Sequence, residues 1–411
     1  MSVIAESDRT VVDAAPPAPG AVHMPPSAAL PSLELNAILQ KLDLSFLVDR
    51  MLAMPTRYYV SVSVVCDIVC PFCPRQYYGE LVDNGVMSYE AFRTVAPHLK
   101  YADFAGMFGL GEPFLHKDFF RFLTLAKEAG AWTTTNSHGM SLTDEIVRKL
   151  IDHKLDHINC SMDGHNKKLF EFLRAGAVFE TVIENLKRFT AIKKELGVEH
   201  PQLQIAVTVS RHNVAHMADM VKLAREVGAT AISFSNLIII NPDNAHLSVV
   251  NTPLFDGNLA KAKELGKKFG IPVDFFFQNP LPWVLEPTDA ARHGKRFGCH
   301  EAWRALTIER RGQTKPCCYI EEPIGNAFET PIAELRNSQA FIDLRRSLME
   351  GRPDEFCRNC GNLRMVTRET ASQRVEEAAD LFAKATSLSI EEREWVAGLI
   401  GEYRTLAAAL A

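Results

Sequence analysis

The chain has 411 residues, of which 47% are hydrophobic and 23% charged, and its formal net charge is -5. These values are typical of an ordinary soluble globular protein, and the small net charge gives no indication of nucleic-acid binding. No apolar run of about 18 residues predicts a membrane span, and the basic and apolar segments of a secretory signal are missing. We therefore expect a cytoplasmic protein with one large core and a smaller module.

The nine cysteines are distributed unevenly along the chain. Eight of them fall into two groups, which are Cys66, Cys70 and Cys73, then Cys299, Cys317, Cys318, Cys357 and Cys360. Close groups of cysteines in a cytoplasmic chain favour metal binding over disulfide bonds. The ninth, Cys160, lies in a predicted strand, where we expect it to be a small buried side chain.

The first 56 residues contain none of the candidate site residues. Residues 1–31 are rich in Ala and Pro, which predicts a disordered tail. From Leu33 to Met54 the apolar residues recur at helical spacing, so an amphipathic lead-in helix is expected within residues 32–56. Its predicted role is packing.

Residues 57–240 alternate six times between strand and helix patterns. The predicted strands are 58–65, 103–108, 132–135, 157–162, 203–209 and 231–234, and the predicted helices are 88–99, 117–129, 143–153, 179–196 and 214–227. Such alternation implies parallel strands with right-handed crossovers. We therefore predict an α/β fold, a partial (β/α)6 TIM-like barrel whose active site lies at the carboxyl ends of the strands.

The rest of the chain divides into three predicted parts. Residues 241–298 are expected to connect the barrel to a cysteine-containing module at 299–363. Residues 364–411 read as two helices with a break near Ser387.

The first cysteine group directly follows the first predicted strand, with the spacing C-x3-C-x2-C. Three thiolates can hold three irons of a cubane cluster and leave the fourth iron open to another ligand. A zinc knuckle is the alternative, but structural zinc takes four ligands and no histidine stands close by.

This loop resembles the signature of the radical S-adenosylmethionine (radical SAM) superfamily, in which an aromatic residue, here Phe72, precedes the third cysteine. The resemblance implies the fold of a radical SAM partial barrel. It also implies that Cys66, Cys70 and Cys73 ligate a 4Fe-4S cluster, that S-adenosylmethionine chelates the fourth iron, and that reduction yields a 5′-deoxyadenosyl radical.

A glycine-rich segment follows the second predicted strand. The run Gly109-Leu110-Gly111-Glu112-Pro113 resembles the family's G-G-E-P motif, with Leu110 in place of the first paired glycine. Glycine lets the backbone approach a ligand closely, and the Glu112 carboxylate can meet the methionyl ammonium. An ordinary turn is the alternative interpretation.

Further polar residues follow the third and fourth strands. Asn136 ends the third, and Ser161 and Asp163 resemble the family's S-x-D segment, so the resemblance implies contacts to the ribose and the methionyl group. Arg174 matches a position where related enzymes keep an arginine near the methionyl carboxylate. Helix caps and a solvated surface charge are the alternatives.

The second cysteine group has the spacing C-x12-G-x4-C, with Gly312 in the turn of a predicted hairpin, followed by C-x2-C. It resembles the SPASM/Twitch extension of radical SAM proteins. Because no cysteine follows Cys360, the shorter Twitch form, a β-hairpin plus helix, fits better. The resemblance implies one auxiliary 4Fe-4S cluster, ligated by Cys299, Cys317, Cys357 and Cys360.

Two alternatives stay open in this module. Adjacent residues of a strand point to opposite faces, so only one of Cys317 and Cys318 is expected to ligate, and the spacing to Gly312 favours Cys317. A zinc site of four cysteines is the alternative to the cluster.

With both clusters, the resemblance implies an oxidoreductase that abstracts a hydrogen atom and oxidises the substrate radical with help from the auxiliary cluster. The cysteine pattern resembles that of the Twitch dehydrogenases of aminoglycoside biosynthesis, which favours a small biosynthetic metabolite as substrate. A reductant such as flavodoxin or ferredoxin is implied as partner.

Two other functions are considered. One is a maturase that modifies a ribosomal peptide or protein, although the residues before Tyr58 predict no leader-binding domain. The other is a non-catalytic iron–sulfur electron carrier, which would need no S-adenosylmethionine pocket. No catalytic acid or base is assigned; candidates near the strand ends are Arg75, Tyr77, Tyr78, His138 and His165.

Overall fold

The computed structural model describes residues 30–79, 84–239, 241–276, 296–317, 320, 322–353, 357, 360 and 362–410. Most of the predicted tail at 1–31 and part of the predicted connection at 241–298 lie outside the described residues. Among those that are described, no helix is both long and apolar enough to cross a membrane.

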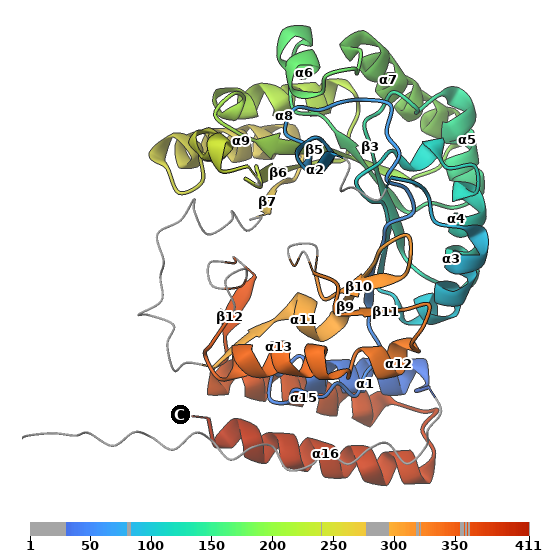
Figure 1. Ribbon diagram of the computed structural model, residues 1–411, viewed down its shortest axis with the longest axis vertical. Coiled ribbons are helices and arrows are strands. Elements are labelled where there is room, and N and C mark those ends of the chain that lie inside the picture. Colours follow the sequence, from blue (N-terminus) through green and yellow to red (C-terminus); the bar gives the residue numbers. More distant parts are fainter. Residues whose placement is uncertain are drawn as a thin grey trace, which may run out of the picture.

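A curved ten-stranded sheet forms the centre of the molecule, in the order β11-β10-β9-β1-β2-β3-β4-β5-β6-β7. Its parallel strands are β1 Arg57–Val60, β2 Phe104–Met107, β3 Thr133–Ser137, β4 His157–Ser161, β5 Gln202–Val209, β6 Ala231–Asn236 and β7 Val273–Phe276. The sheet curls inside an arc of helices (Figure 1). The first six of these strands confirm the predicted partial barrel.

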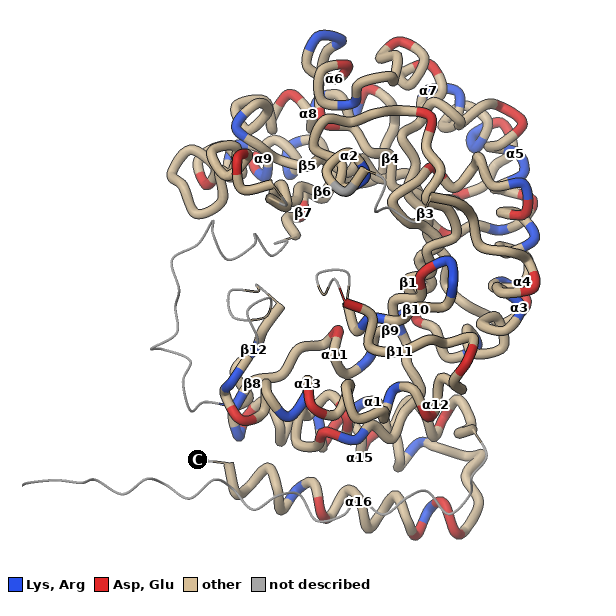
Figure 2. The backbone as a smooth tube through the Cα atoms, in the orientation of Figure 1, with Lys and Arg blue, Asp and Glu red and all other residues tan. Residues whose placement is uncertain are grey.

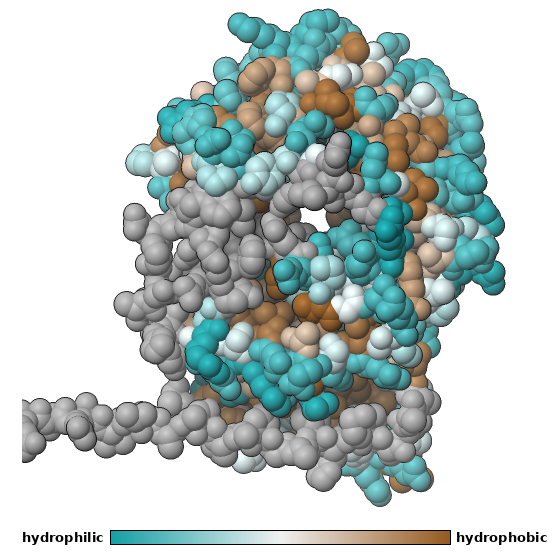
Figure 3. All heavy atoms as spheres, in the orientation of Figure 1, coloured by the Kyte–Doolittle hydropathy of each residue, from teal (hydrophilic) through white to brown (hydrophobic). Residues whose placement is uncertain are grey.

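Helices cover the outer side of the curved sheet. They are α3 Tyr89–Val95, α4 Phe119–Glu128, α5 Asp144–Asp152, α6 Lys167–Leu173, α7 Phe179–Leu196, α8 Met217–Glu226 and α9 Pro253–Phe269. Their apolar stripes are buried in one large core, as Phe119 and Phe122 of α4 illustrate. Charged residues recur along these helices (Figure 2), and hydrophilic residues cover much of their outer surface in the view of Figure 3.

The two sides of each strand have different surroundings. In β4, Ile158 and Cys160 belong to the buried core, whereas Asn159 and Ser161 alternate with them and are half-buried. Side chains of a strand point alternately to its two faces. The expectation that Cys160 is a small core residue is therefore confirmed.

The structure extends the predicted barrel by one unit. Residues 241–298 were expected to connect two modules, but they contain α9 and the parallel strand β7, which pairs with β6 from Ile232↔Val273 to Ser235↔Phe276. The four residues of β7 show no clear alternation of apolar and polar side chains, so the sequence pattern did not reveal the strand.

The expectation of a lead-in helix through Met54 is wrong in length, because α1 spans only Leu33–Asp43. The Asp43 carboxylate accepts hydrogen bonds from the backbone N–H groups of Leu52 and Ala53, at 3.1 and 2.8 Å. The chain therefore turns back on itself after α1. Apolar residues beyond Asp43, such as Leu47, are still buried, but in an irregular segment.

The C-terminal part adds three strands to the curved sheet and also forms a separate two-stranded sheet. Its strands are β8 Phe297–Cys299, β9 Ala305–Ile308, β10 Gln313–Lys315, β11 Gly325–Asn326 and β12 Leu363–Met365, and its helices are α11 His300–Arg304, α12 Ile332–Leu335 and α13 Gln339–Met349. Strand β9 pairs in parallel with β1 and antiparallel with β10, which confirms the predicted hairpin. Gly312 occupies its turn with a φ of 89°.

Two long helices form a layer beneath this part (Figure 1). They are α15 Arg368–Lys384 and α16 Ile390–Ala408, and the gap between them contains Ser387, where the sequence predicts a break. Helix α15 packs against α1, so residues from the two ends of the described chain share a second apolar core.

A buried ion pair joins these parts. Asp43 and Arg336 are 0% and 5% exposed, and the Arg336 Nη2 atom lies 3.5 Å from Asp43 Oδ2. Burial raises the pKa of Asp43, and the neighbouring Arg336 opposes this rise. Arg345, also buried, donates to the carbonyl oxygens of Ala302 and Arg336. The N-terminal segment is thereby tied to α12 and α13.

We expect Asp43→Ala to lower the free energy of unfolding by about 3–5 kcal/mol, because it leaves a buried guanidinium without its partner. Thermal and denaturant unfolding would measure the loss. Arg404→Ala is the control, since it removes an exposed ion pair with Glu376 and should change stability little. Equal stability of the two variants would contradict the role given to Asp43.

Candidate active site at the mouth of the barrel

The first cysteine loop follows β1 at the carboxyl end of the sheet. Cys66, Cys70 and Cys73 are half-buried, and burial raises the pKa of each thiol. The loop is tied down by its backbone, since Val69 donates to the carbonyl oxygen of Ala175 at 2.8 Å. Cys73 precedes the short helix α2, Pro74–Tyr78, so the third thiol sits at a fixed helix start.

Phe72, which precedes the third cysteine, is half-buried and packs against other side chains of the barrel mouth. Its ring stacks on His212 with centroids 5.9 Å apart and an interplanar angle of 17°. It also packs against a small apolar cluster that contains Leu237, Ile239 and Leu247. Phe72 thus links the cysteine loop to the segments that follow β5 and β6.

The glycine-rich segment after β2 lies directly against the cysteine loop. The N–H groups of Gly111 and Glu112 donate to the carbonyl oxygens of Ser63 and Val65, at 3.1 and 2.8 Å. A Cβ atom at Gly111 would come within 2.3 Å of the Val65 carbonyl oxygen, so only glycine fits. Leu110 is 42% exposed and points elsewhere, which explains why this departure from the G-G-E-P pattern fits the fold.

The Glu112 side chain is 1% exposed and is held at both oxygens. Oε1 accepts a hydrogen bond from the Ser137 hydroxyl at 3.0 Å, and Oε2 accepts one from the His138 N–H at 3.0 Å. Burial raises the pKa of Glu112, and the nearby His138 acts against this rise. A cation bound beside this carboxylate would therefore favour its ionised form.

His138 connects Glu112 to the cysteine loop. Its Nδ1 accepts the N–H of Met140 at 3.1 Å, so the ring proton of the neutral form resides on Nε2. Nε2 lies 2.7 Å from Asp67 Oδ1 and 3.3 Å from Glu112 Oε2. Asp67 is part of the cysteine loop, and its carboxylate, the Cys66 thiol and the His138 ring meet within 4.8 Å. We call this arrangement the His138 latch.

The predicted contacts after β3 and β4 lie at neighbouring positions of the sheet. Asn136 accepts a hydrogen bond from the Asn159 amide at 2.9 Å, and Ser161 ends β4. Asp163 is buried and accepts the Thr208 N–H at 2.7 Å. Arg174 Nε lies 2.6 Å from the second oxygen of Asp163, and the guanidinium also borders the Cys70 thiol.

These residues fit the cofactors that the sequence predicts. Three half-buried thiols with raised pKa values have no cation among their main neighbours except Arg75 and Arg174, so a cluster would supply the positive charge that keeps them as thiolates. The Gly111 backbone leaves no room for a side chain, and Glu112 presents a buried carboxylate. The donor set therefore suits an iron–sulfur cluster with an amino-acid ligand beside it.

The second cysteine group is assembled from three separate segments. Cys299 ends β8 and pairs across the β8–β12 ladder with Leu363, three residues after Cys360. Burial raises the pKa of Cys299 to about 11, and the nearby Cys360 thiol adds to this rise. The N–H of Cys360 donates to the carbonyl oxygen of Cys357 at 3.1 Å, and Cys317 follows β10. Cys318 lies outside the described residues.

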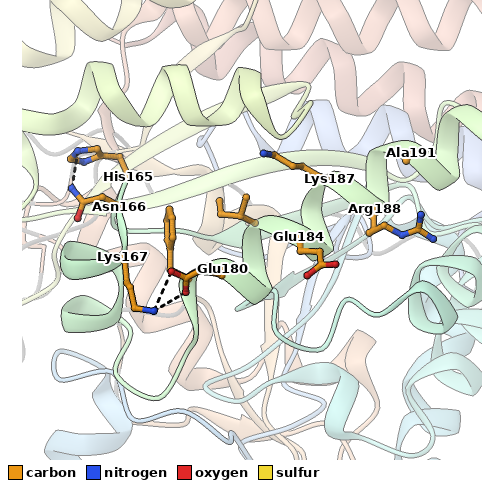
Figure 4. A pocket seen from close by; sticks show the side chains of 10 residues that line it. His165, Asn166, Lys167, Glu180, Glu184, Lys187, Arg188 and Ala191 are labelled. Atoms are coloured by element: carbon orange, nitrogen blue, oxygen red, sulfur yellow. Dashed lines mark hydrogen bonds and ion pairs between the residues drawn. The ribbon is translucent and has the colours of Figure 1, made fainter.

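The unassigned candidates have different positions. His138 is part of the latch, whereas Tyr77 is 51% exposed and Arg75 is half-buried; the side chain of Tyr78 lies outside the description. His165 lines one end of a shallow groove of about 620 Å³ between α6 and α7, on the outer side of the barrel (Figure 4). This groove also contains Lys167, Glu180 and Arg188, and it is separate from the cysteine loop.

Sequence reasoning missed three residues of this site. Asp67 anchors the latch, Asn213 donates to the Asp163 carbonyl oxygen at 2.9 Å, and Asn159 supports Asn136. Asp67 stands inside the C-x3-C spacing, so its position in the motif was a usable signal. Asn213 and Asn159 reach their partners only because neighbouring strands place them side by side, so no local sequence pattern indicates them.

Two family models match the chain. The model of the radical SAM superfamily matches residues 60–224, and that of an iron–sulfur cluster-binding domain, SPASM, matches residues 299–361. An AdoMet-dependent heme synthase of Methanosarcina barkeri is 30% identical over 265 residues, which are 61% of this chain and 72% of that protein. The chain belongs to the radical SAM superfamily.

Other proteins similar to this radical SAM enzyme have varied names. A PqqA peptide cyclase of Streptomyces rochei is 21% identical over 332 residues, which are 76% of this chain and 83% of the cyclase. A third relative, from Pyrococcus furiosus, is named tungsten-containing aldehyde ferredoxin oxidoreductase cofactor-modifying protein. It is 25% identical to this chain over 211 residues, which are 49% of this chain. The present chain spans 55% of that relative's length.

A solved structure shares the fold. Streptococcus suis SuiB superposes with a TM-score of 0.55 and 16% identity, covering 72% of this chain and 68% of that one. SuiB has been solved with S-adenosylmethionine and with its precursor peptide SuiA. The two matching family models assign to this radical SAM enzyme a 4Fe-4S cluster with S-adenosylmethionine and an auxiliary iron–sulfur cluster. Which residues bind them is our proposal.

We expect Gly111→Ala to displace the cysteine loop, because the added Cβ would collide with the Val65 carbonyl oxygen. Overpacking of this kind costs about 1–3 kcal/mol of stability, and S-adenosylmethionine binding measured by equilibrium dialysis should fall with it. Gly257→Ala in α9 is the control, since nothing lies within 4 Å of its Cβ. Unchanged binding in Gly111→Ala would contradict the close packing.

His138→Ala should loosen the cysteine loop, because Asp67 loses its hydrogen-bond partner, while the buried Glu112 keeps its bonds from Ser137 and the backbone of residue 138. Loss of such a hydrogen bond costs about 0.5–1.5 kcal/mol, and the iron retained after reconstitution should fall by up to about four atoms per chain. His116→Ala is matched, since it removes another buried histidine, which bonds to Met87. If both variants retain equal iron, the latch does not hold the cluster loop.

Proposed function

We propose that this radical SAM enzyme is a maturase that modifies a ribosomally made peptide or protein. The observation that carries the radical chemistry is the His138 latch, which holds the cysteine loop against the buried Glu112. Support for a peptide substrate comes from the relatives, because one is a PqqA peptide cyclase and SuiB was solved with its precursor peptide. These relatives favour the maturase over the small-metabolite oxidase that the cysteine pattern suggested.

The bound cluster and S-adenosylmethionine would supply a 5′-deoxyadenosyl radical that abstracts a hydrogen atom from the substrate. In our proposal Cys66, Cys70 and Cys73 hold the cluster, and Glu112 binds the methionyl ammonium. His138 orients Glu112 and fixes the loop through Asp67, without touching the substrate.

The other predicted contacts have supporting roles in this proposal. Asn136 and Ser161 would contact the ribose, and Asp163 orients Arg174 through their ion pair. Arg174 pairs with Asp163 through Nε, which is one of the five N–H donors of a guanidinium. The remaining N–H groups can bind the methionyl carboxylate. Phe72 and His212 stack and restrict the other side of the loop.

The auxiliary cluster is proposed to accept an electron from the substrate radical. Of its proposed ligands, Cys317 follows β10 of the barrel sheet, whereas Cys299 ends β8 of the separate two-stranded sheet that also contains β12. Because β9 pairs with both β1 and β10, the hairpin before Cys317 is attached to the strand that precedes the first cysteine loop. A flavodoxin or ferredoxin is the proposed reductant.

A second function has its own support. The Methanosarcina barkeri relative is a heme synthase, and its 30% identity over 72% of its length favours a small organic substrate. Oxidation of a small biosynthetic molecule therefore remains the competing candidate.

The two candidates differ in the substrate fraction that stimulates cleavage. We expect reconstituted, dithionite-reduced enzyme to form more 5′-deoxyadenosine from S-adenosylmethionine when the peptide and protein fraction of host extract is added. The small-molecule fraction should have little effect. Liquid chromatography would measure the deoxyadenosine, and mass spectrometry would identify the altered peptide.

The control is a variant with Cys66, Cys70 and Cys73 all replaced by Ala, which should form no deoxyadenosine. Stimulation by the small-molecule fraction alone would favour the metabolite oxidase instead. No deoxyadenosine under any condition, from protein with both clusters loaded, would leave the electron carrier as the function.

A further inference from the structure

Three metal-ligating side chains meet at the rim of the barrel, outside the cysteine loop. His165 lies between β4 and α6, His216 directly precedes α8, and Asp219 is in the first turn of α8. Their ligand atoms all lie within 4.8 Å of one another. The two imidazole rings are 4.5 Å apart between centroids. None of these residues has a role in the proposed S-adenosylmethionine site.

The spacing of these atoms suits a metal ion. His216 Nδ1 lies 3.3 Å from Asp219 Oδ2. Zinc binds imidazole nitrogen and carboxylate oxygen at about 2.0–2.2 Å, and a tetrahedral ion then holds neighbouring donors about 3.3 Å apart. In addition, His165 Nδ1 is buried and has no hydrogen-bond partner within the part of the chain that the structure describes. A buried ring nitrogen without a partner is unfavourable, and a metal bond would provide one.

We propose that His165, His216 and Asp219 bind one divalent transition-metal ion, with water in the remaining position. Two imidazoles and one carboxylate form a ligand set that zinc commonly uses. The alternative is that the same atoms only cap α8, with His216 hydrogen-bonded to Asp219.

Two neighbours must adjust when the metal binds. The Asn166 amide nitrogen lies 2.9 Å from His165 Nε2, as Figure 4 shows. If Nδ1 binds the metal, Nε2 carries the ring proton and the Asn166 amide can no longer donate to it. The Asn166 oxygen caps α6 by accepting the Leu169 N–H at 3.1 Å, so the imidazole N–H loses its contact with Asn166 and turns to water. Lys222 Nζ lies 2.8 Å from Asp219 Oδ1 and adds a positive charge that weakens the site.

The metal would connect two loops at the mouth of the barrel. The loop after β4 carries Asp163, and the loop after β5 carries Asn213, which donates to the Asp163 carbonyl oxygen. His165 and His216 belong to the same two loops. An ion held between them would add a second link on the Asp163 side of the mouth, whatever the substrate is.

Zinc binding to the full chain tests this site. Both clusters are loaded first, because empty cysteine sites also bind zinc. Equilibrium dialysis with zinc alone should give one bound ion per wild-type chain, and His216→Gln and Asp219→Asn should each lose it. Lys222→Ala should retain the ion and bind it more tightly, and His246→Gln, an exposed histidine elsewhere, should bind it as the wild type does.

X-ray absorption identifies the ligands of the bound zinc. We expect a nitrogen and oxygen shell at about 2.0 Å and no sulfur at about 2.3 Å. A melting temperature in zinc-free buffer and an iron content equal to those of the wild type would show that the variants are folded. Asp219→Asn also keeps the shape of the side chain and removes only its charge. Equal zinc in wild type and both ligand variants, a sulfur shell, or no bound zinc in the wild type would each overturn the proposal.

Discussion

The carboxylate of Glu112 is almost completely withdrawn from water at the mouth of the barrel, and the arrangement around it follows from that burial. A buried carboxylate is unfavourable unless hydrogen bonds or a cation compensate it. Ser137 and the backbone of His138 supply hydrogen bonds, and the His138 ring lies beside the carboxylate, with Nε2 3.3 Å from Oε2. The same ring is hydrogen-bonded to Asp67, so the position of the cysteine loop depends on His138, the residue that also lies against Glu112.

The same principle applies at the opposite end of the molecule. Asp43 is fully buried beneath the sheet, and Arg336 with two backbone N–H groups compensates it. These contacts join the N-terminal segment to helices that follow the auxiliary hairpin. Because β9 pairs with β1, the hairpin of the C-terminal part belongs to the sheet of the barrel, while β8 and β12 form a separate sheet. Cys317, which follows this hairpin, is thus attached to the sheet that also positions the first cysteine loop.

This continuity has a consequence for the chemistry that we propose. The β9–β1 pairing attaches the hairpin before Cys317 to the strand that precedes the first cysteine loop, without a linker between them. The relatives of this chain carry names as different as heme synthase and peptide cyclase, and a shared fold does not fix the reaction.

The sequence by itself determined the alternation of strands and helices, both cysteine motifs and the order of polar residues at the strand ends, because these are local patterns with fixed periods and spacings. Only the tertiary structure decided where α1 ends, that β7 extends the barrel and that β9 joins β1. It also brought Asp67 to His138, and His165 to His216, although these pairs are 71 and 51 positions apart. Contacts of this kind depend on how separate loops pack at one edge of a sheet, and no local periodicity encodes them.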